Sequence, residues 1–264
     1  MDNDRIKMHI KMKRQYFLMA MVVLMASGLR AQEYKLAKNT GELNIQEVNH
    51  VKIEGYGGKE IIFSSSSYSH DRDDRAKGLR AISGLGLEDN TGLGLSVMEA
   101  NGVVEVRQLK KMDGPNILIK VPQGMGIKYV HTSPYGSDVE IKNVEGNLSV
   151  STVHNDVKLE NTTGLLDVRT VHGDIDARFD AISKPVSLAS THGHVDVTMP
   201  VATKADLKLN TSWGEIFVDP GFKLEMDKAG GMMKYSDKIT AKINGGGTGI
   251  ALSSSHDNIY LRKN

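Results

Sequence analysis

A histidine followed by Gly or Asn, and then by an acid or a second histidine, recurs in the C-terminal half of the sequence. The copies read "TVHND" at 152–156, "TVHGD" at 170–174 and "STHGH" at 190–194. Imidazole nitrogens and carboxylate oxygens are good ligands for divalent metals such as zinc. If the copies lay side by side, four side chains could in principle converge on one ion: His172, Asp174, His192 and His194.

The elements that would position these residues are short strands. Pairs of apolar residues at i and i+2 follow and separate the copies, and this alternation indicates strands with one face turned inward. The first members of the pairs are Val139, Leu148, Val157, Leu166, Ile175, Val186, Val195, Leu207 and Ile216. Each step across a histidine-type turn is nine residues, whereas the alternate steps lengthen from 9 to 12. One turn therefore has a fixed length, and the other tolerates insertions.

This repeat predicts an all-β fold. We expect a single-domain parallel β-helix (a β-solenoid) with coils of roughly 18–21 residues and two short strands per coil in the regular half. Successive coils would stack so that Val157, Ile175 and Val195 lie beneath one another. The irregular N-terminal part and the C-terminal "NIYLRKN" are the expected caps of the stack.

The N-terminal residues predict export. Basic residues precede eleven apolar residues from Tyr16 to Ala26, followed by a small-residue zone that ends at Ala31. This is the plan of a signal peptide, residues 1–31, with translation starting at Met1 or Met12. A retained membrane anchor is the alternative, but the apolar run is short for a membrane-spanning helix. The exported domain would span 32–264, with irregular coils at 32–130 and regular coils at 131–264.

The composition excludes several classes of partner and of site. Residues 1–31 contain six Lys/Arg and two Asp/Glu, so the net charge changes from +1 for the chain to −3 for the remainder. A slightly acidic domain argues against nucleic acid as a partner. The sequence has no cysteine, which excludes a lipid-modified cysteine, disulfides and thiolate metal sites. We expect no membrane span after cleavage and no cofactor.

Three stretches resemble a known group of proteins. They are "ILIKVPQGMGIKYVHTSPYGSDVEI", the recurring strands of "GD[VI]x[VLA]" type, and the ending "INGGGTGIALSSSHDNIYLRK". The chain is similar to bacterial adhesin-like β-helix families of unknown function, relatives of the head GIN domain. The resemblance covers nearly all of the exported domain. It implies the fold and residence in the periplasm, on the outer-membrane surface or outside the cell, without implying a particular ligand.

The histidine column has a metal-binding and a structural interpretation. Trp213 occupies the same place in its copy as His154, His172 and His192, and because an indole cannot ligate a metal, the position favours a flat ring that stacks. The following Gly or Asn would supply positive φ, and the acid would accept backbone N–H groups within its turn. We therefore assign no catalytic residue and no metal site, and take the four rings as a ligand-facing edge.

Two functions remain open at this stage. The first is an exported, non-enzymatic module that binds a glycan or protein at the cell envelope or serves as a scaffold. The second is a carbohydrate-active or metal-dependent enzyme that uses the His/Asp edge, because polysaccharide-acting enzymes also use β-helices. An incompletely capped stack would also permit end-to-end self-association.

Overall fold

A computed structural model describes residues 32–65, 74–76, 78–226 and 238–264. The predicted signal peptide, residues 1–31, and the choice of starting methionine lie outside these residues. Residues Gln32–Asn264 form one compact unit.

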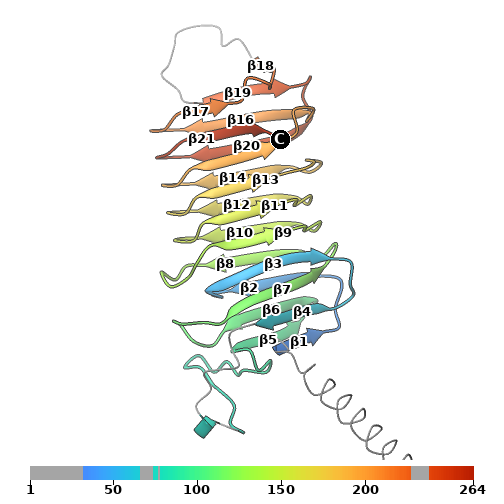
Figure 1. Cartoon of the computed structure of the whole chain (residues 1–264), viewed down its shortest axis with the longest axis vertical. Coiled ribbons are helices and arrows are strands. Elements are labelled where there is room, and N and C mark those ends of the chain that lie inside the picture. The colour runs from blue at the N-terminus through green and yellow to red at the C-terminus, as the bar shows by residue number, and fades with distance from the viewer. Residues whose placement is uncertain (1–31, 66–73, 77, 227–237) are drawn as a thin grey trace, which may run out of the picture. The chain divides into compact units, whose positions relative to one another are not determined.

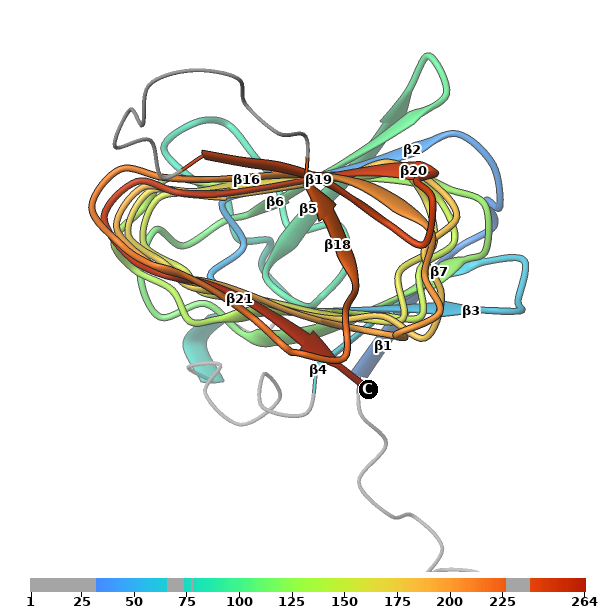
Figure 2. The same cartoon turned by 90° about the horizontal axis from the view of Figure 1, so that it is seen from above.

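The described residues form two large β-sheets that face each other (Figure 2). Sheet A contains, in spatial order, β1 (Gln32–Leu36), β4 (Ile61–Ser65), β7 (Asn116–Pro122), β3 (His50–Tyr56), β9 (Val139–Lys142), β11 (Val157–Glu160), β13 (Ile175–Arg178), β15 (Val195–Met199), β21 (Ile259–Lys263) and β17 (Ile216–Val218). Sheet B contains β18 (Leu224–Met226), β19 (Lys238–Ile243), β16 (Ala205–Thr211), β20 (Thr248–Ser254), β14 (Val186–Ser190), β12 (Leu166–Thr170), β10 (Leu148–Thr152), β8 (Gly126–His131), β2 (Glu42–Gln46), β6 (Val103–Gln108) and β5 (Leu95–Ala100).

The all-β class is confirmed, with both sheets mainly parallel. The helical structure among the described residues is one 3₁₀ turn, η1 (Asp74–Ala76). None of their helices is long and apolar enough to cross a membrane. Antiparallel pairs occur toward the ends of the sheets: β1 with β4, β4 with β7, β5 with β6, and β19 with both β16 and β18.

From β8 to β15 the chain alternates between the two sheets, so strands adjacent in one sheet are next-but-one in sequence (Figure 1). Val157 is the register partner of Ile175, and Ile175 is the partner of Val195, as the repeat predicts. Buried and more exposed residues alternate along these strands; in β11, for example, Val157 and Leu159 are buried. This alternation places one apolar column over the next between the sheets.

The core is a continuous cluster of apolar side chains between the sheets, mostly Val, Ile and Leu. Branched side chains suit it because they pack well on a pleated surface. The largest fully buried side chains include Tyr129, Phe63 and Phe179. The Tyr129 hydroxyl donates a hydrogen bond to the Val48 carbonyl at 3.0 Å, so its burial leaves no polar atom without a partner.

The strands near the ends do not stack in chain order. β20 lies between β14 and β16, and β21 lies between β15 and β17. The prediction that the C-terminal "NIYLRKN" caps the stack is therefore wrong, because β21 within it is paired on both sides. The N-terminal part has a matching arrangement, in which β3 lies between β7 and β9 and β2 lies between β6 and β8.

Consecutive turns lie so close together that the backbone of one is in contact with the next. A Cβ atom on Gly173 would overlap the carbonyl oxygen of Asn155, and one on Gly193 would overlap that of Gly173. Neither glycine has a positive φ, and Asn155 does not either. The prediction of positive φ at this position is therefore wrong: at Gly173 and Gly193, the neighbouring turn leaves no room for a side chain.

Replacing Gly173 with Ala will force two stacked turns apart. We expect Gly173→Ala to lower the free energy of unfolding by about 1–3 kcal/mol, the usual cost of overpacking. Urea denaturation of residues 32–264 measures this loss. The matched control is Gly249→Ala in β20, where an added Cβ meets nothing within 4 Å. Equal stability of the two variants would contradict close packing of the turns.

Candidate functional site

The histidine column forms a stack of parallel rings on the surface. The centroid distance is 5.3 Å between His154 and His172 and 4.8 Å between His172 and His192. His256 follows at 4.6 Å, and Trp213 lies beyond it at 6.5 Å with its ring tilted by 2°. All five side chains are exposed. The predicted stacking is present, with His256 ahead of Trp213 because β21 lies between β15 and β17.

Beneath the rings, buried hydroxyl groups connect each turn to its neighbour. The Ser190 hydroxyl donates to the Gly173 carbonyl of the neighbouring turn and accepts the Gly193 N–H of its own turn, both at 2.9 Å. Ser254 makes the same two bonds with Gly193 and Asp257, at 2.8 and 3.1 Å. The equivalent residues are Thr152, Thr170, Ser190, Thr211 and Ser254.

This hydroxyl column was not predicted from the sequence. Its signal is a Ser or Thr two residues before each ring, as in "TVH", "STH", "TSW" and "SSH". A buried hydroxyl at every copy meets the requirement that buried backbone N–H and C=O groups have partners. The repeated unit is therefore the hydroxyl, the ring, the small residue and the acid together.

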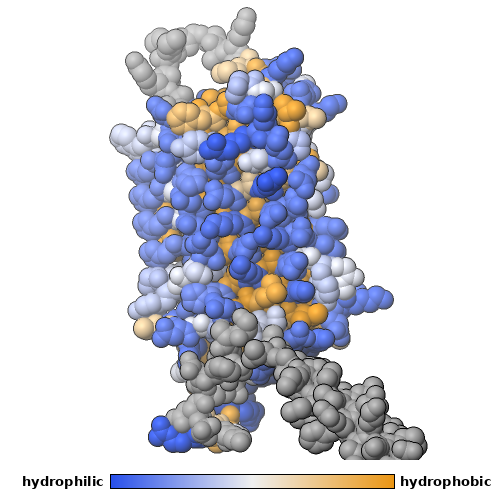
Figure 3. Space-filling model, in the orientation of Figure 1, coloured by the Kyte–Doolittle hydropathy of each residue, from blue (hydrophilic) through white to orange (hydrophobic). Residues whose placement is uncertain are grey.

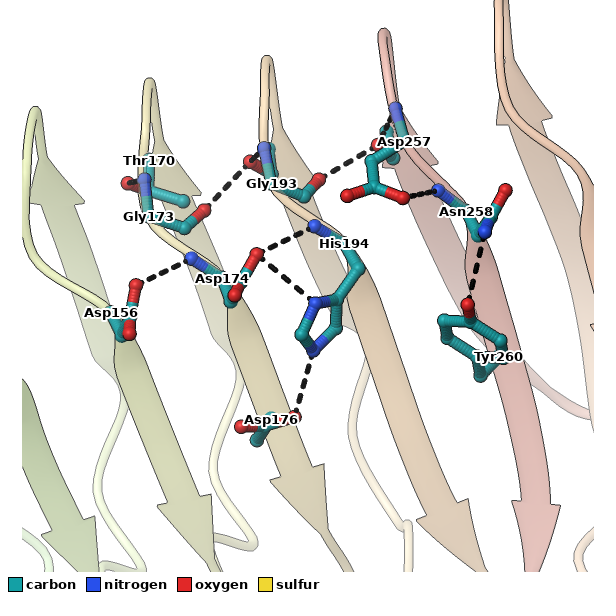
Figure 4. A network of polar contacts seen from close by, with 12 residues as sticks. Asp156, Thr170, Gly173, Asp174, Asp176, Gly193, His194, Asp257, Asn258 and Tyr260 are labelled. Atoms are coloured by element: carbon teal, nitrogen blue, oxygen red, sulfur yellow. Dashed lines mark hydrogen bonds and ion pairs between the residues drawn. The ribbon is translucent and has the colours of Figure 1, made fainter.

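The acid column forms a second ladder (Figure 4). The Asp156 carboxylate accepts the backbone N–H of Asp174, and the Asp174 carboxylate accepts that of His194, both at 2.8 Å. Asn258 accepts the N–H of Glu215 at the same distance. The prediction that each acid caps its own turn is therefore wrong, because these side chains bond to the next turn of the stack.

His194 is held between two carboxylates. Its Nδ1 lies 3.1 Å from Asp174 Oδ1, and its Nε2 lies 3.2 Å from Asp176 Oδ1. Burial alone would lower the pKa of His194. The hydrogen bond to Asp176 and the charges of Asp174, Asp176 and Asp196 outweigh it and raise that pKa above the ordinary value of 6.5.

Only half of the predicted metal quartet comes together. Asp174 and His194 are adjacent, whereas His172 and His192 belong to the ring stack. The reason is their place in the turn: the ring position points outward along the edge, and the acid position lies beside the start of a sheet A strand. Asp257 joins Asp174 and His194, with one ligand atom from each within 4.8 Å of the others. Asp257 was not predicted from the sequence, because it stands where the other copies have glycine or asparagine.

The outward face of sheet A carries alternating charges. Lys142 Nζ lies 2.7 Å from Glu140, which is on the same strand, β9. It lies 2.9 Å from Glu160, which is on the adjacent strand, β11. These hydrogen bonds raise the pKa of Lys142. Lys52 also pairs with Glu140 at 2.8 Å. Figure 3 shows a face on which polar side chains lie in rows with apolar surface between them.

A shallow recess of about 450 Å³ lies on this face. It extends across β9, β11, β13, β15 and β21. Its polar lining includes Lys158, Glu160, Asp176, Arg178, Asp196 and Thr198. The face of sheet B differs, because small side chains dominate its centre: Ser149, Ser151, Ser187, Ala189, Ala251 and Ser253. The two faces therefore offer different surfaces to a partner.

His131 occupies the hydroxyl position at the N-terminal side of the column, where it pairs in register with Thr152. It is fully buried, and its Nε2 lies 3.1 Å from Asn49 Oδ1. Burial lowers its pKa, although the charge of Glu47 and a hydrogen bond to Asn155 oppose that shift. A buried histidine thus takes the place of a hydroxyl where the regular column begins.

Together, these features define an exceptionally repetitive all-β protein: two large, mainly parallel sheets joined by turns that bond to one another through ladders of hydroxyl and acid side chains. The chain belongs to the Toastrack DUF4097 family, whose model matches residues 6–262.

Two solved structures are similar to the chain. One is a "putative cell adhesion protein" from Clostridium sporogenes, at 12% identity and a TM-score of 0.41, covering 89% of this chain and 100% of that one. The other is a "putative adhesin" from Parabacteroides merdae, at 9% identity and a TM-score of 0.26, covering 89% and 95%. No curated protein matches the chain.

Removing one hydroxyl from the column will weaken the stack. Ser190→Ala leaves the Gly193 N–H and the Gly173 carbonyl without their side-chain partner, so we expect it to cost about 1–3 kcal/mol of folding free energy. The control is Ser187→Ala, on the outward side of the same strand. Equal unfolding midpoints for the two variants in urea would show that the column contributes nothing.

The buried His131 will make stability depend on pH. Its lowered pKa means that, below 6.5, the unfolded chain binds a proton more readily than the folded chain, so this contribution is present at neutral pH and is lost on acidification. We expect His131→Gln to lose less stability than the wild type between pH 7 and 5. Urea titrations at each pH measure this, with His154→Gln as the exposed control. Parallel curves for the wild type and His131→Gln would refute it.

Proposed function

We propose that the chain is an exported, non-catalytic β-solenoid that binds a component of the bacterial cell envelope or serves as a scaffold there. In this interpretation, residues 1–31 are a cleaved signal peptide and residues 32–264 are the working domain. The coils have roughly 18–21 residues and two strands each. The domain resides in the periplasm, on the outer-membrane surface or outside the cell.

The observation that carries this proposal is the in-register pairing from β9 to β15. Because every strand repeats the same inward and outward positions, side chains that are 18 or 20 residues apart become neighbours on a flat surface. Neighbouring strands lie about 4.8 Å apart, so the surface presents groups at a regular interval. Such a surface suits a repetitive or extended partner.

Sheet A is the face that we assign to binding. Its recess is shallow and lies across several strands, and both positively and negatively charged side chains line it. Paired charges leave little net field, so recognition would depend on hydrogen bonds rather than on long-range attraction. A sugar polymer or a polar protein surface has the matching chemistry. Asp167 and Arg169 lie on sheet B and pair with each other at 3.1 Å.

The strands at the ends of the sheets bear on self-association. β17 and β1 are the two outermost strands of sheet A, and β17 has only β21 as a partner among the described strands. Trp213, which precedes β17, and Phe217, within β17, are both exposed. End-to-end association of copies therefore remains part of the proposal, and size-exclusion chromatography across protein concentrations would detect it.

The experiment tests binding through sheet A. Fluorescently labelled residues 32–264 would be sedimented with envelope fractions of the source bacterium. We expect saturable binding that falls at least tenfold in the double variant Lys158→Gln, Arg178→Gln and survives in Arg169→Gln on sheet B. Protease treatment of the envelopes will separate a protein partner from a glycan.

Three results would overturn the proposal. They are the absence of saturable binding, binding that ignores the sheet A substitutions, and release of soluble sugar from the envelopes. The last result would instead indicate a carbohydrate-active enzyme. Circular dichroism of each variant will confirm that the fold is retained, because both substituted side chains are exposed.

A further inference from the structure

Three side chains from three consecutive turns converge at the corner where the acid column meets sheet A. Asp174 precedes β13, His194 precedes β15 and Asp257 lies in the turn before β21. One ligand atom of each lies within 4.8 Å of the other two, and all three residues are half-buried. Figure 4 shows the carboxylates of Asp174 and Asp257 on either side of the His194 backbone, with its imidazole directed toward Asp176.

The Asp176 carboxylate fixes the orientation of the His194 ring. Its Oδ1 lies 3.2 Å from Nε2, a position in which it accepts a hydrogen bond when Nε2 carries the hydrogen. Histidines that bind metals commonly donate their other ring N–H to a carboxylate, which sets the tautomer and strengthens the ligand. In that tautomer, the lone pair of Nδ1 faces Asp174.

In this tautomer, the contact between Nδ1 and Asp174 requires a cation. In the neutral ring, the Nδ1 lone pair and Asp174 Oδ1 are two acceptors only 3.1 Å apart, and they attract only if a proton or a metal ion lies between them. Two ligand atoms bound to zinc at about 2.0–2.2 Å with tetrahedral angles are about 3.4 Å apart. The separation of Nδ1 and Asp174 Oδ1 is close to that value, and the ligand atom of Asp257 lies within 4.8 Å of both residues' ligand atoms.

The backbone already holds the ligands in place. Asp174 Oδ1 accepts the His194 N–H at 2.8 Å, and Asp257 Oδ1 accepts the Asn258 N–H at 2.7 Å. The turns themselves are fixed by Ser190 and Ser254. A metal ion would therefore bind a site whose ligands need only small side-chain movements.

We propose that Asp174, His194 and Asp257 form a binding site for one divalent transition-metal ion of the zinc type, with Asp176 as the residue that positions His194. One imidazole and two carboxylates favour zinc over calcium, which prefers oxygen ligands alone. Three protein ligands leave a coordination position for water or for a group on a partner. The three ligands lie outside the lining of the sheet A recess, and Asp176 is the residue that the two proposed sites share.

The ring stack is a poor alternative site. His154, His172, His192 and His256 lie in nearly parallel planes, with successive rings tilted by 8–13°. The lone pairs of an imidazole lie in the plane of its ring. Lone pairs in parallel planes do not converge on one point, so two stacked rings cannot bind the same ion without turning.

The test uses zinc and the domain 32–264. Isothermal titration with ZnCl₂, together with elemental analysis after dialysis, should give one ion per chain. We expect His194→Gln and Asp257→Asn each to weaken binding at least tenfold. Asp176→Asn should weaken it about tenfold, as loss of a supporting carboxylate commonly does. The double variant His172→Gln, His192→Gln should bind zinc as the wild type does.

Two outcomes would overturn this site. One is the absence of stoichiometric zinc binding by the wild type. The other is binding that survives His194→Gln and disappears in the double variant, which would assign the metal to the ring stack. Absorption of the Co²⁺-substituted protein will report the geometry, and thermal unfolding without metal will show that each variant is folded.

Discussion

The distance between one turn and the next constrains the rest of the molecule. At the histidine-type corner, the backbones approach until a Cβ atom on Gly173, Gly193 or Gly214 would overlap a carbonyl oxygen of the neighbouring turn. Such contact is tolerable only if the buried N–H and C=O groups there have partners, and the column of Ser and Thr hydroxyls supplies them. Once the corners are fixed, the strands that leave them have a single register, and each apolar pair falls into the core.

Much of this architecture follows from the sequence because strand periodicity and turn length are local properties. The pairs Val157/Leu159 and Ile175/Ala177 indicate both the strand and its buried face, and the constant nine-residue step indicates which corner is rigid. The stacking order near the C-terminus is not local. Ile250/Leu252 and Leu207/Leu209 have the same alternation, so nothing in their pattern shows which pair contacts β14.

The candidate site, too, could be predicted from the sequence only in part. Spacing places the rings in one column, and the structure shows them stacked. The sequence pattern does not show whether a glycine is needed for positive φ or for close contact with the next turn, because the residue is glycine in both cases. Asp257 shows a further limit: it stands where the other copies have glycine or asparagine, and its nearness to His194 arises only because β21 is inserted beside β15.

The charges on sheet A follow the register as well. Along one outward column the residues read Lys52, Glu140, Lys158 and Asp176, so opposite charges are neighbours across the strands. The alternation breaks where Asp176 meets Asp196, and like charges opposite each other are unfavourable. His194 and Arg262 approach these two carboxylates and compensate for the break.

The insertion of β20 and β21 has a consequence for the order of events during biosynthesis. β16 and β17 leave the ribosome before β20 and β21, yet their places in the sheets lie beyond them, so they have no finished surface to join until the last residues arrive. Coils up to β15 can assemble progressively, whereas the C-terminal end can close only after translation is complete. A chain cut short before residue 259 would lack β21, the strand that joins β15 to β17. The edge of β15 would then have no pairing strand and would be open to solvent.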